Sequence, residues 1–172
     1  YLGTDTDTID ISLDELLKSG ALVEKELGGR AFVFLKSAYR DEKTISDRIK
    51  ILLRFPPPQC KTLDADIEKI EQEDGIQYAD NQKEAIKTAL DRGILILTGG
   101  PGTGKTTTLN GILKLFERQE LDIALAAPTG RAAKRMTELT GREAKTIHRL
   151  LEVEWDEHDQ PVFKRNLRNP LE

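Results

Sequence analysis

Residues 99–106 have the types and spacing needed to hold a phosphate chain. They read Gly-Gly-Pro-Gly-Thr-Gly-Lys-Thr and match the pattern G-x-x-x-x-G-K-[ST] at every fixed position. Phosphate oxygens must come within hydrogen-bonding distance of successive backbone N–H groups, and a Cβ atom would block that approach. The residues predicted to contact a nucleotide here are Gly99, Gly100, Gly102, Thr103, Gly104, Lys105, Thr106 and Thr107. The alternative is a glycine-rich turn before a helix, with no ligand.

Two of these residues are predicted to be catalytic. The Lys105 ammonium is expected to reach the β- and γ-phosphates as a point charge, and the Thr106 hydroxyl is expected to ligate Mg²⁺ that arrives with the nucleotide. The helix that follows would direct its N-terminal dipole at the phosphates. Such a loop predicts nucleotide binding but does not distinguish between functions, since kinases, transporters and helicases all use one.

The flanking segments predict an α/β fold. Residues 82–92 and 105–118 carry apolar side chains at helical spacing, whereas 93–98 and 122–127 are apolar runs typical of strands covered on both faces. Strand, helix and strand would form a βαβ unit with a right-handed connection. We therefore expect a three-layer P-loop NTPase domain over residues 75–172.

Residues 1–55 predict a separate, small α+β module. A capping-box pattern, with Ser12 as N-cap and Glu15 three residues later, predicts a short helix. Two strands, 22–27 and 30–35, are joined by a Gly-Gly turn, and a second helix should follow. This order resembles part of a winged-helix unit. Because the segment lacks the basic cluster of a DNA-binding face, a structural spacer is favoured over DNA contact.

Residues 56–74 are predicted to be a linker followed by an acidic helix. Pro56, Pro57 and Pro58 would break a helix and make a stiff, extended linker. In the acidic helix, Ile67 and Ile70 would face inward.

Composition excludes several classes of protein. The chain has 172 residues and one cysteine, so it can form no intramolecular disulfide, and its two histidines lie far from that cysteine in sequence. No apolar run approaches the roughly 20 residues that span a bilayer, and no signal-peptide pattern precedes the domain. A cytoplasmic protein with no membrane partner is expected. Tyr1 as first residue and Met136 as sole methionine suggest a fragment of a longer protein.

Basic side chains gather in one stretch of the chain. Residues 128–149 contain six basic and two acidic residues, a local net charge of +4 in a chain of net charge −4. A basic patch beside a nucleotide site is what a motor that follows a phosphate backbone requires. The alternative is an ordinary solvated helix face.

Two motifs in this stretch carry a family resemblance. Residues 126–136 (Ala-Ala-Pro-Thr-Gly-Arg-Ala-Ala-Lys-Arg-Met) and 146–152 (Thr-Ile-His-Arg-Leu-Leu-Glu), together with the glycine-rich loop, resemble the RecD-like branch of superfamily 1 helicases. The resemblance implies a RecA-like motor domain, a single-stranded DNA partner and 5′ to 3′ movement in recombination or repair. It places the DNA contacts on Thr129, Gly130, Arg131, Lys134, Thr146 and His148.

A third motif in the resemblance concerns the base. Residues 78–86 look like the family's Q-motif, in which a glutamine reads adenine, and that glutamine would be Gln82. Its amide can both donate and accept, which suits adenine and makes ATP the expected nucleotide. A plain surface glutamine is the alternative.

Parts that such a motor needs are missing from the sequence. No apolar strand ending in Asp-Glu follows Glu152, and no second RecA-like domain supplies arginine fingers. We expect the domain to be incomplete at its C-terminus and the 172 residues alone to hydrolyse ATP poorly. Another superfamily 1 helicase, of RNA or relaxase type, or a non-catalytic nucleotide-gated binding module stay open as alternatives. Protein partners are unknown.

Overall fold

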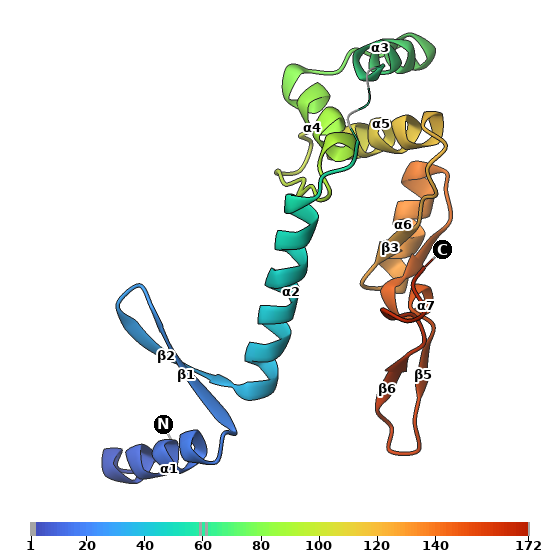
Figure 1. Cartoon of the computed structure of the whole chain (residues 1–172). Helices are drawn as coiled ribbons and strands as arrows, with labels where there is room; N and C mark the ends of the chain where they lie inside the picture. Colours follow the sequence, from blue (N-terminus) through green and yellow to red (C-terminus); the bar gives the residue numbers. More distant parts are fainter. Residues whose placement is uncertain (1–2, 59, 61, 172) are drawn as a thin grey trace. The chain divides into compact units, whose positions relative to one another are not determined.

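The computed structural model describes residues 3–58, 60 and 62–171. The chain divides into two compact units, Tyr1–Phe55 and Pro56–Glu172. Figure 1 labels their helices and strands along the chain.

The first unit consists of a helix, a hairpin and a second helix. Helix α1 (Thr6–Lys18) precedes strands β1 (Leu22–Leu27) and β2 (Arg30–Leu35), and α2 (Lys36–Arg54) follows. The two strands pair antiparallel from Leu22 opposite Leu35 to Leu27 opposite Arg30, as predicted. The turn residues Gly28 and Gly29 have φ angles of 59° and 76°, which glycine adopts without a steric penalty.

The prediction that α1 begins at Ser12 is wrong. The helix begins at Thr6, where the Asp5 carboxylate accepts a hydrogen bond from the Thr8 backbone N–H at 2.8 Å. The Ser12 hydroxyl lies inside the helix and donates to the Thr8 carbonyl. Asp5 is as good an N-cap residue as serine, and it lies upstream, so the helix gains almost two more turns.

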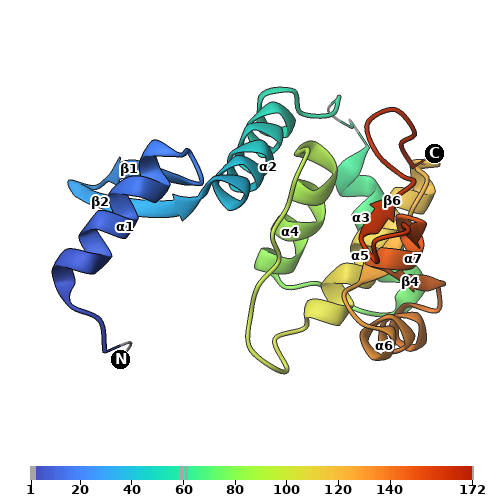
Figure 2. The ribbon, with the colours of Figure 1, turned by 90° about the horizontal axis from the view of Figure 1, so that it is seen from below.

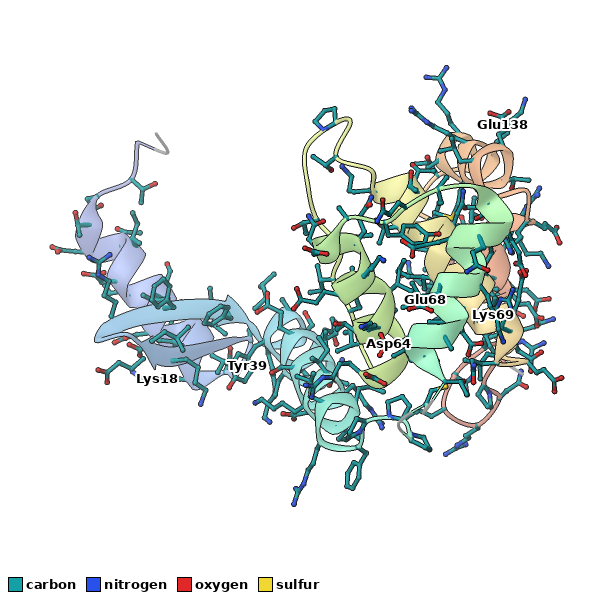
Figure 3. The ribbon with its side chains drawn as sticks, turned by 90° about the horizontal axis from the view of Figure 1, so that it is seen from above. Lys18, Tyr39, Asp64, Glu68, Lys69 and Glu138 are labelled. Atoms are coloured by element: carbon teal, nitrogen blue, oxygen red, sulfur yellow. The ribbon has the colours of Figure 1, made fainter. Side chains whose placement is uncertain are left out.

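No residue of α1 or α2 is buried. Tyr39, labelled in Figure 3, lies at the start of α2 with its ring 5.8 Å from that of Phe34 on β2. The winged-helix resemblance of this unit stays a prediction.

The second unit holds the glycine-rich loop and both family motifs. Its helices are α3 (Leu63–Asp74), α4 (Asp80–Asp91), α5 (Lys105–Arg118), α6 (Gly130–Thr140) and α7 (Ile147–Leu150). Its strands are β3 (Leu125–Ala127), β4 (Ala144–Thr146), β5 (Val153–Trp155) and β6 (Pro161–Phe163). Strands β3 and β4 pair in parallel, whereas β5 and β6 form an antiparallel hairpin. Mixed helix and strand with a parallel pair agree with an α/β P-loop fold.

The core of this unit lies between α3, α4 and α5, which Figures 1 and 2 show side by side. Ile67 and Ile70 of α3 are 2% and 1% exposed, as their inward placement in the sequence predicted. They pack with Ile86 of α4 and Leu115 of α5, both fully buried. Burial of such side chains contributes about 1.5–3 kcal/mol each.

Glycine allows one especially close contact in this core. A Cβ atom added to Gly111 of α5 would lie 2.7 Å from both the Tyr78 hydroxyl and the Ile86 Cδ1 atom. Tyr78 itself is 3% exposed, and burial raises the pKa of its phenol. Only glycine at 111 therefore lets α5 approach Tyr78 and α4 this closely.

Acidic α3 is also tied to its neighbours by charge. Four of its carboxylates form ion pairs with basic side chains of α4 and α5. Figure 3 labels Asp64, Glu68 and Lys69 on this helix. The pairs are Asp64–Lys87 and Glu71–Lys83 with α4, and Glu73–Arg118 and Asp74–Lys114 with α5. The lysine and arginine hydrogen bonds hold the pKa values of Glu71 and Glu73 below their usual range.

The predicted strand over 93–98 does not form. Residues 94–98 have no strand structure and run as an extended loop from α4 toward α5 (Figure 2). Leu95 packs on the core, but Ile96 is 80% exposed. A strand needs a partner for its backbone groups, and within the described residues the parallel sheet contains only β3 and β4.

The second predicted strand is shorter than expected. It covers Leu125–Ala127 instead of 122–127. The expected βαβ unit through α5 is consequently absent from the described part of the chain, and the parallel connection that exists runs from β3 through α6 to β4.

Candidate nucleotide and nucleic-acid sites

The glycine-rich loop ends in a sharp turn into α5. Gly104 is the N-cap residue with φ 78°, and Gly102 has φ 76°, so both lie where a side chain would be strained. No side chain caps α5 at this end. The N–H groups of its first turn, which have no intrahelical partner, are therefore available to phosphate oxygens.

The Lys105 side chain turns back over the loop. Its ammonium donates hydrogen bonds to the carbonyl oxygens of Gly99 and Gly100. The Thr103 hydroxyl donates to the same Gly100 carbonyl at 2.9 Å. The loop thus places a single positive charge over its own backbone, where phosphate oxygens would approach. Thr106 and Thr107 follow on the exposed side of the first turn of α5.

Gln82 lies beside this loop, and both the oxygen and the nitrogen of its side-chain amide form hydrogen bonds. Its Oε1 accepts from the Ala79 backbone N–H at 3.0 Å, and its Nε2 donates to the Gly104 carbonyl at 3.4 Å. It thereby connects the start of α4 to the N-cap of α5. Adenine reading by Gln82 stays a prediction, and it requires the amide to exchange at least one of these partners.

The two family motifs, residues 126–136 and 146–152, meet at one edge of the parallel sheet. Strands β3 and β4 pair with Ala127 opposite Thr146, so their carboxyl ends coincide. Thr129 follows β3 and its hydroxyl accepts from the Ala132 N–H at 3.2 Å, which caps α6. Thr146 ends β4 and caps α7 by accepting from the Arg149 N–H at 3.2 Å. Ligands of parallel α/β sheets bind at this edge.

The remaining predicted DNA contacts surround these two threonines. Arg131 and Lys134 are exposed on α6, and His148 is exposed on α7. Gly130 begins α6 with open space where a Cβ would stand. The structure therefore gathers all six predicted residues around neighbouring strand ends; their role in binding DNA stays a prediction.

The basic patch is smaller than its sequence count suggests. Arg142 forms a two-pronged ion pair with Glu117 of α5, with 2.6 Å between its Nε and the carboxylate, and this holds the pKa of Glu117 below its usual range. Lys145 lies 4.0 Å from Glu143. Among the described residues, no ion pair involves Arg131, Lys134, Arg135 or Arg149. The uncompensated charge is thus concentrated on α6 and α7.

Comparison with known proteins places this arrangement in a family. A family model described as an AAA domain matches residues 82–172, more than half of the chain. The chain belongs to this AAA-domain family. The match begins at Gln82 and takes in the glycine-rich loop, the parallel pair and the β5–β6 hairpin.

Individual relatives of this AAA-domain chain are named as DNA helicases or as RecD subunits. It is 37% identical over 123 residues to the ATP-dependent RecD2 DNA helicase of Deinococcus radiodurans, which covers 72% of this chain and 17% of that protein. It is 44% identical over 95 residues to the RecBCD enzyme subunit RecD of Mycolicibacterium smegmatis, covering 42% of this chain and 17% of that subunit. A phage T4 protein, the ATP-dependent DNA helicase dda, is 43% identical over 58 residues, covering 33% and 13%. The resemblance to RecD-like helicases is thereby confirmed, and the chain spans about a sixth of the first two relatives.

Two features of the AAA domain had no signal in the sequence. Asn110 of α5 donates from Nδ2 to the Leu139 carbonyl of α6 at 3.2 Å, and Glu117 of α5 binds Arg142. Both contacts join residues 25 or more positions apart, and nothing in the local sequence marks them.

That a magnesium ion arrives with the nucleotide stays a prediction. In the described part of the chain, no group of three or more His, Cys, Asp or Glu side chains could hold a metal. The exposed Thr106 hydroxyl on the first turn of α5 fits a magnesium ion bridged by phosphates, which needs few protein ligands. Among the described helices, none has the length and apolar character to cross a bilayer.

Proposed function

We propose that this chain is the ATP-binding front part of the motor of an ATP-dependent DNA helicase. The observation that carries the proposal is that the first turn of α5 lies beside the basic helix α6. Thr106 of the glycine-rich loop and Arg135 of the basic helix α6 line the same hollow between α5 and α6. The first turn of α5 and the basic helix α6 therefore border one hollow, which suits a motor that tracks phosphates.

Each residue has a part in the proposed reaction. The N–H groups of the loop and of the first turn of α5 would hold the phosphates, and Lys105 would move from its loop carbonyls to the β- and γ-phosphate oxygens. Thr106 would hold Mg²⁺, which when bound neutralises charge on the phosphates. Gln82 would read adenine and, through Gly104, orient the loop.

The finer parts of the proposal rest on the family resemblance. They are 5′ to 3′ translocation on single-stranded DNA, a role in recombination or repair, and a three-layer RecA-like domain completed by further strands. The Walker B carboxylates and the arginine fingers would come from other parts of the protein. For residues 1–55 we propose a structural spacer, because no basic cluster marks a DNA face.

The experiment is strand separation by the full-length protein on duplexes with a 5′ or a 3′ single-stranded tail, with ATP and Mg²⁺. We expect unwinding of the 5′-tailed duplex only, and a decrease of at least about 100-fold in rate with Lys105→Ala. Lys114→Met, which alters a lysine on the same helix away from the loop, is the matched control and should unwind normally. ATP binding without any unwinding would favour the nucleotide-gated binding module instead.

The DNA surface has its own test. Removal of one phosphate-binding side chain should reduce the slope of log K against log salt by about 0.7 on a single strand. The double variant Arg131→Glu, Lys134→Glu should therefore flatten the slope by about 1.4 and leave ATP affinity unchanged. An equal slope in variant and wild type would remove these two residues from the DNA site.

Adenine preference tests Gln82. Gln82→Ala should lose the preference for ATP over GTP, because the amide supplies the only proposed contact to the base edge. Equal use of ATP and GTP by the wild type would contradict this role for Gln82 and leave the phosphate site standing.

A further inference from the structure

The carboxyl end of α6 is held by the helix that carries the nucleotide loop. A helix leaves its last four carbonyl groups without intrahelical partners. In α6, the Leu139 carbonyl accepts from Asn110 Nδ2 at 3.2 Å, and the Thr140 carbonyl accepts from Arg142 Nη1 at 3.0 Å. Asn110 lies on α5, and Arg142 is bound to Glu117 on the same helix. These two hydrogen bonds therefore connect the carboxyl end of α6 to α5, one directly through Asn110 and one through Arg142 and Glu117.

The other half of the Asn110 amide serves no contact. Its Oδ1 atom is buried and has no hydrogen-bond partner among the described residues. An unpartnered buried acceptor opposes folding, so an apolar residue of the same shape would suit stability better at this position. What the amide supplies is the hydrogen bond that fixes α6 to α5.

Space separates the two helices from the first turn of α5 to the carboxyl end of α6. An apolar hollow of about 190 Å³ lies between them, with Thr106 and Leu109 of α5 on one side and Ala132, Met136 and Leu139 of α6 on the other. Protein interiors are otherwise close-packed. The contact between α5 and α6 is therefore incompletely filled from Thr106 to Thr140, and the Asn110–Leu139 hydrogen bond joins the two helices beside this hollow.

We propose that Asn110 is a positioning residue that couples the nucleotide site to the DNA site. The inference rests on the proposed function. Bound nucleotide would contact the first turn of α5. The Asn110–Leu139 hydrogen bond would transmit a displacement of α5 to α6, and the hollow between the helices leaves space for α6 to move. At its other end α6 carries Thr129, Arg131 and Lys134, so a small shift changes how these residues meet phosphates.

The test measures coupling rather than activity. In the full-length protein, the affinity for a labelled oligothymidine is measured by anisotropy with and without a non-hydrolysable ATP analogue and Mg²⁺. The ratio of the two dissociation constants is the coupling factor, which is about 5–150 in allosteric proteins. A purely structural role would alter both affinities and the melting temperature together and leave this ratio unchanged.

Asn110→Leu should bring the coupling factor close to one while the affinity for the oligothymidine without analogue stays within about threefold and the melting temperature does not fall. Asn110→Gln, which keeps a donor, should recover part of the factor. Lys114→Met removes an ion pair between α5 and α3 and should leave the factor unchanged.

A second variant tests the same coupling in case Asn110→Leu does not fold. Arg142→Met removes the other connection between α5 and the end of α6 and should also lower the coupling factor. If the wild-type coupling factor exceeds one and neither variant changes it, the inference is overturned and the proposed function stands. A wild-type coupling factor of one has the same consequence. A wild-type protein that binds neither nucleotide nor single-stranded DNA overturns both.

Discussion

The two loop-to-helix junctions of the AAA domain are built in opposite ways. Helix α5 follows an unpaired segment, and its N-cap residue is Gly104, which has no side chain to cap it. Helix α6 follows the paired strand β3, and its N-cap residue is Thr129, whose hydroxyl accepts a hydrogen bond from the Ala132 N–H. The first junction leaves its N–H groups for a ligand, whereas the second uses one of them to hold itself in place.

Each junction therefore depends on a different source of order. Since the segment before α5 has no strand partner, α5 is positioned by its side facing Tyr78 and α4, where Gly111 permits close approach. The position of α6 comes from the strand before it and from its own cap. A binding loop can thus be left open when the helix behind it is held by packing further along.

The largest effect should come from filling the close contact behind the open junction. Gly111→Ala places a methyl group against Tyr78 and Ile86 and should lower the free energy of unfolding by about 1–3 kcal/mol. Urea unfolding measures this. Gly130→Ala is the matched control, because no heavy atom lies within 4 Å of its added Cβ, and it should be neutral or stabilise by up to about 1 kcal/mol. Equal effects at both glycines would contradict the contrast.

Removing the cap of the closed junction should have the next largest effect. Thr129→Ala should lower the free energy of unfolding by about 0.5–2 kcal/mol, and Thr129→Ser should restore most of it. Thr106→Ala, on the first turn of α5, should change stability by less than about 0.5 kcal/mol. If Thr106→Ala destabilised the fold as much as Thr129→Ala, the first turn of α5 would not be open.

Backbone exchange distinguishes the segments before the two helices. Amide hydrogens of Leu125–Ala127 should be protected through pairing with β4, whereas those of 94–98 should exchange close to the unprotected rate. Hydrogen exchange followed by NMR reads each amide. Comparable protection of the two segments would show that 94–98 has found a strand partner.

The smallest effect should be the acid sensitivity of three ion pairs, which range from partly buried to exposed. Glu71, Glu73 and Glu117 have lowered pKa values because of hydrogen bonds from Lys83, Arg118 and Arg142. A pKa lowered by folding adds stability that is present above the usual value of about 4.5 and is lost as pH falls through the lowered pKa. The urea midpoint should thus be flat from pH 7 to 5 and fall below 4.5. Arg118→Met should reduce that fall, and an unchanged acid limb would exclude the Glu73 pair as a contributor.

What the sequence predicted well was local. The helix over 105–118 and both hairpin strands have the bounds that apolar spacing and the Gly-Gly turn predicted. The strand over 93–98 failed because apolar character marks a segment that can pair, while pairing depends on a neighbour elsewhere in the chain. The start of α1 failed because two good N-caps compete, and the upstream Asp5 gives the longer helix.

The candidate site divides in the same way. The loop glycines, Lys105 and the two threonines at the strand ends could be found from motifs, since each motif describes one continuous segment. The engagement of Gln82 with Gly104 and of Asn110 with Leu139 could not, because these contacts join helices that only the tertiary structure brings together.

Helix α3 affects where this domain can be cut. The family match starts at Gln82, yet Leu63, Ile67, Ile70 and Tyr78 lie before it and form half of the buried cluster. A protein that begins at residue 82 would expose Ile86, Ile112 and Leu115 to water as an apolar surface. We expect such a protein to aggregate on expression. Limited proteolysis should accordingly stop at the Pro56–Pro58 linker and spare α3, which makes residue 56 the boundary for a well-behaved recombinant fragment.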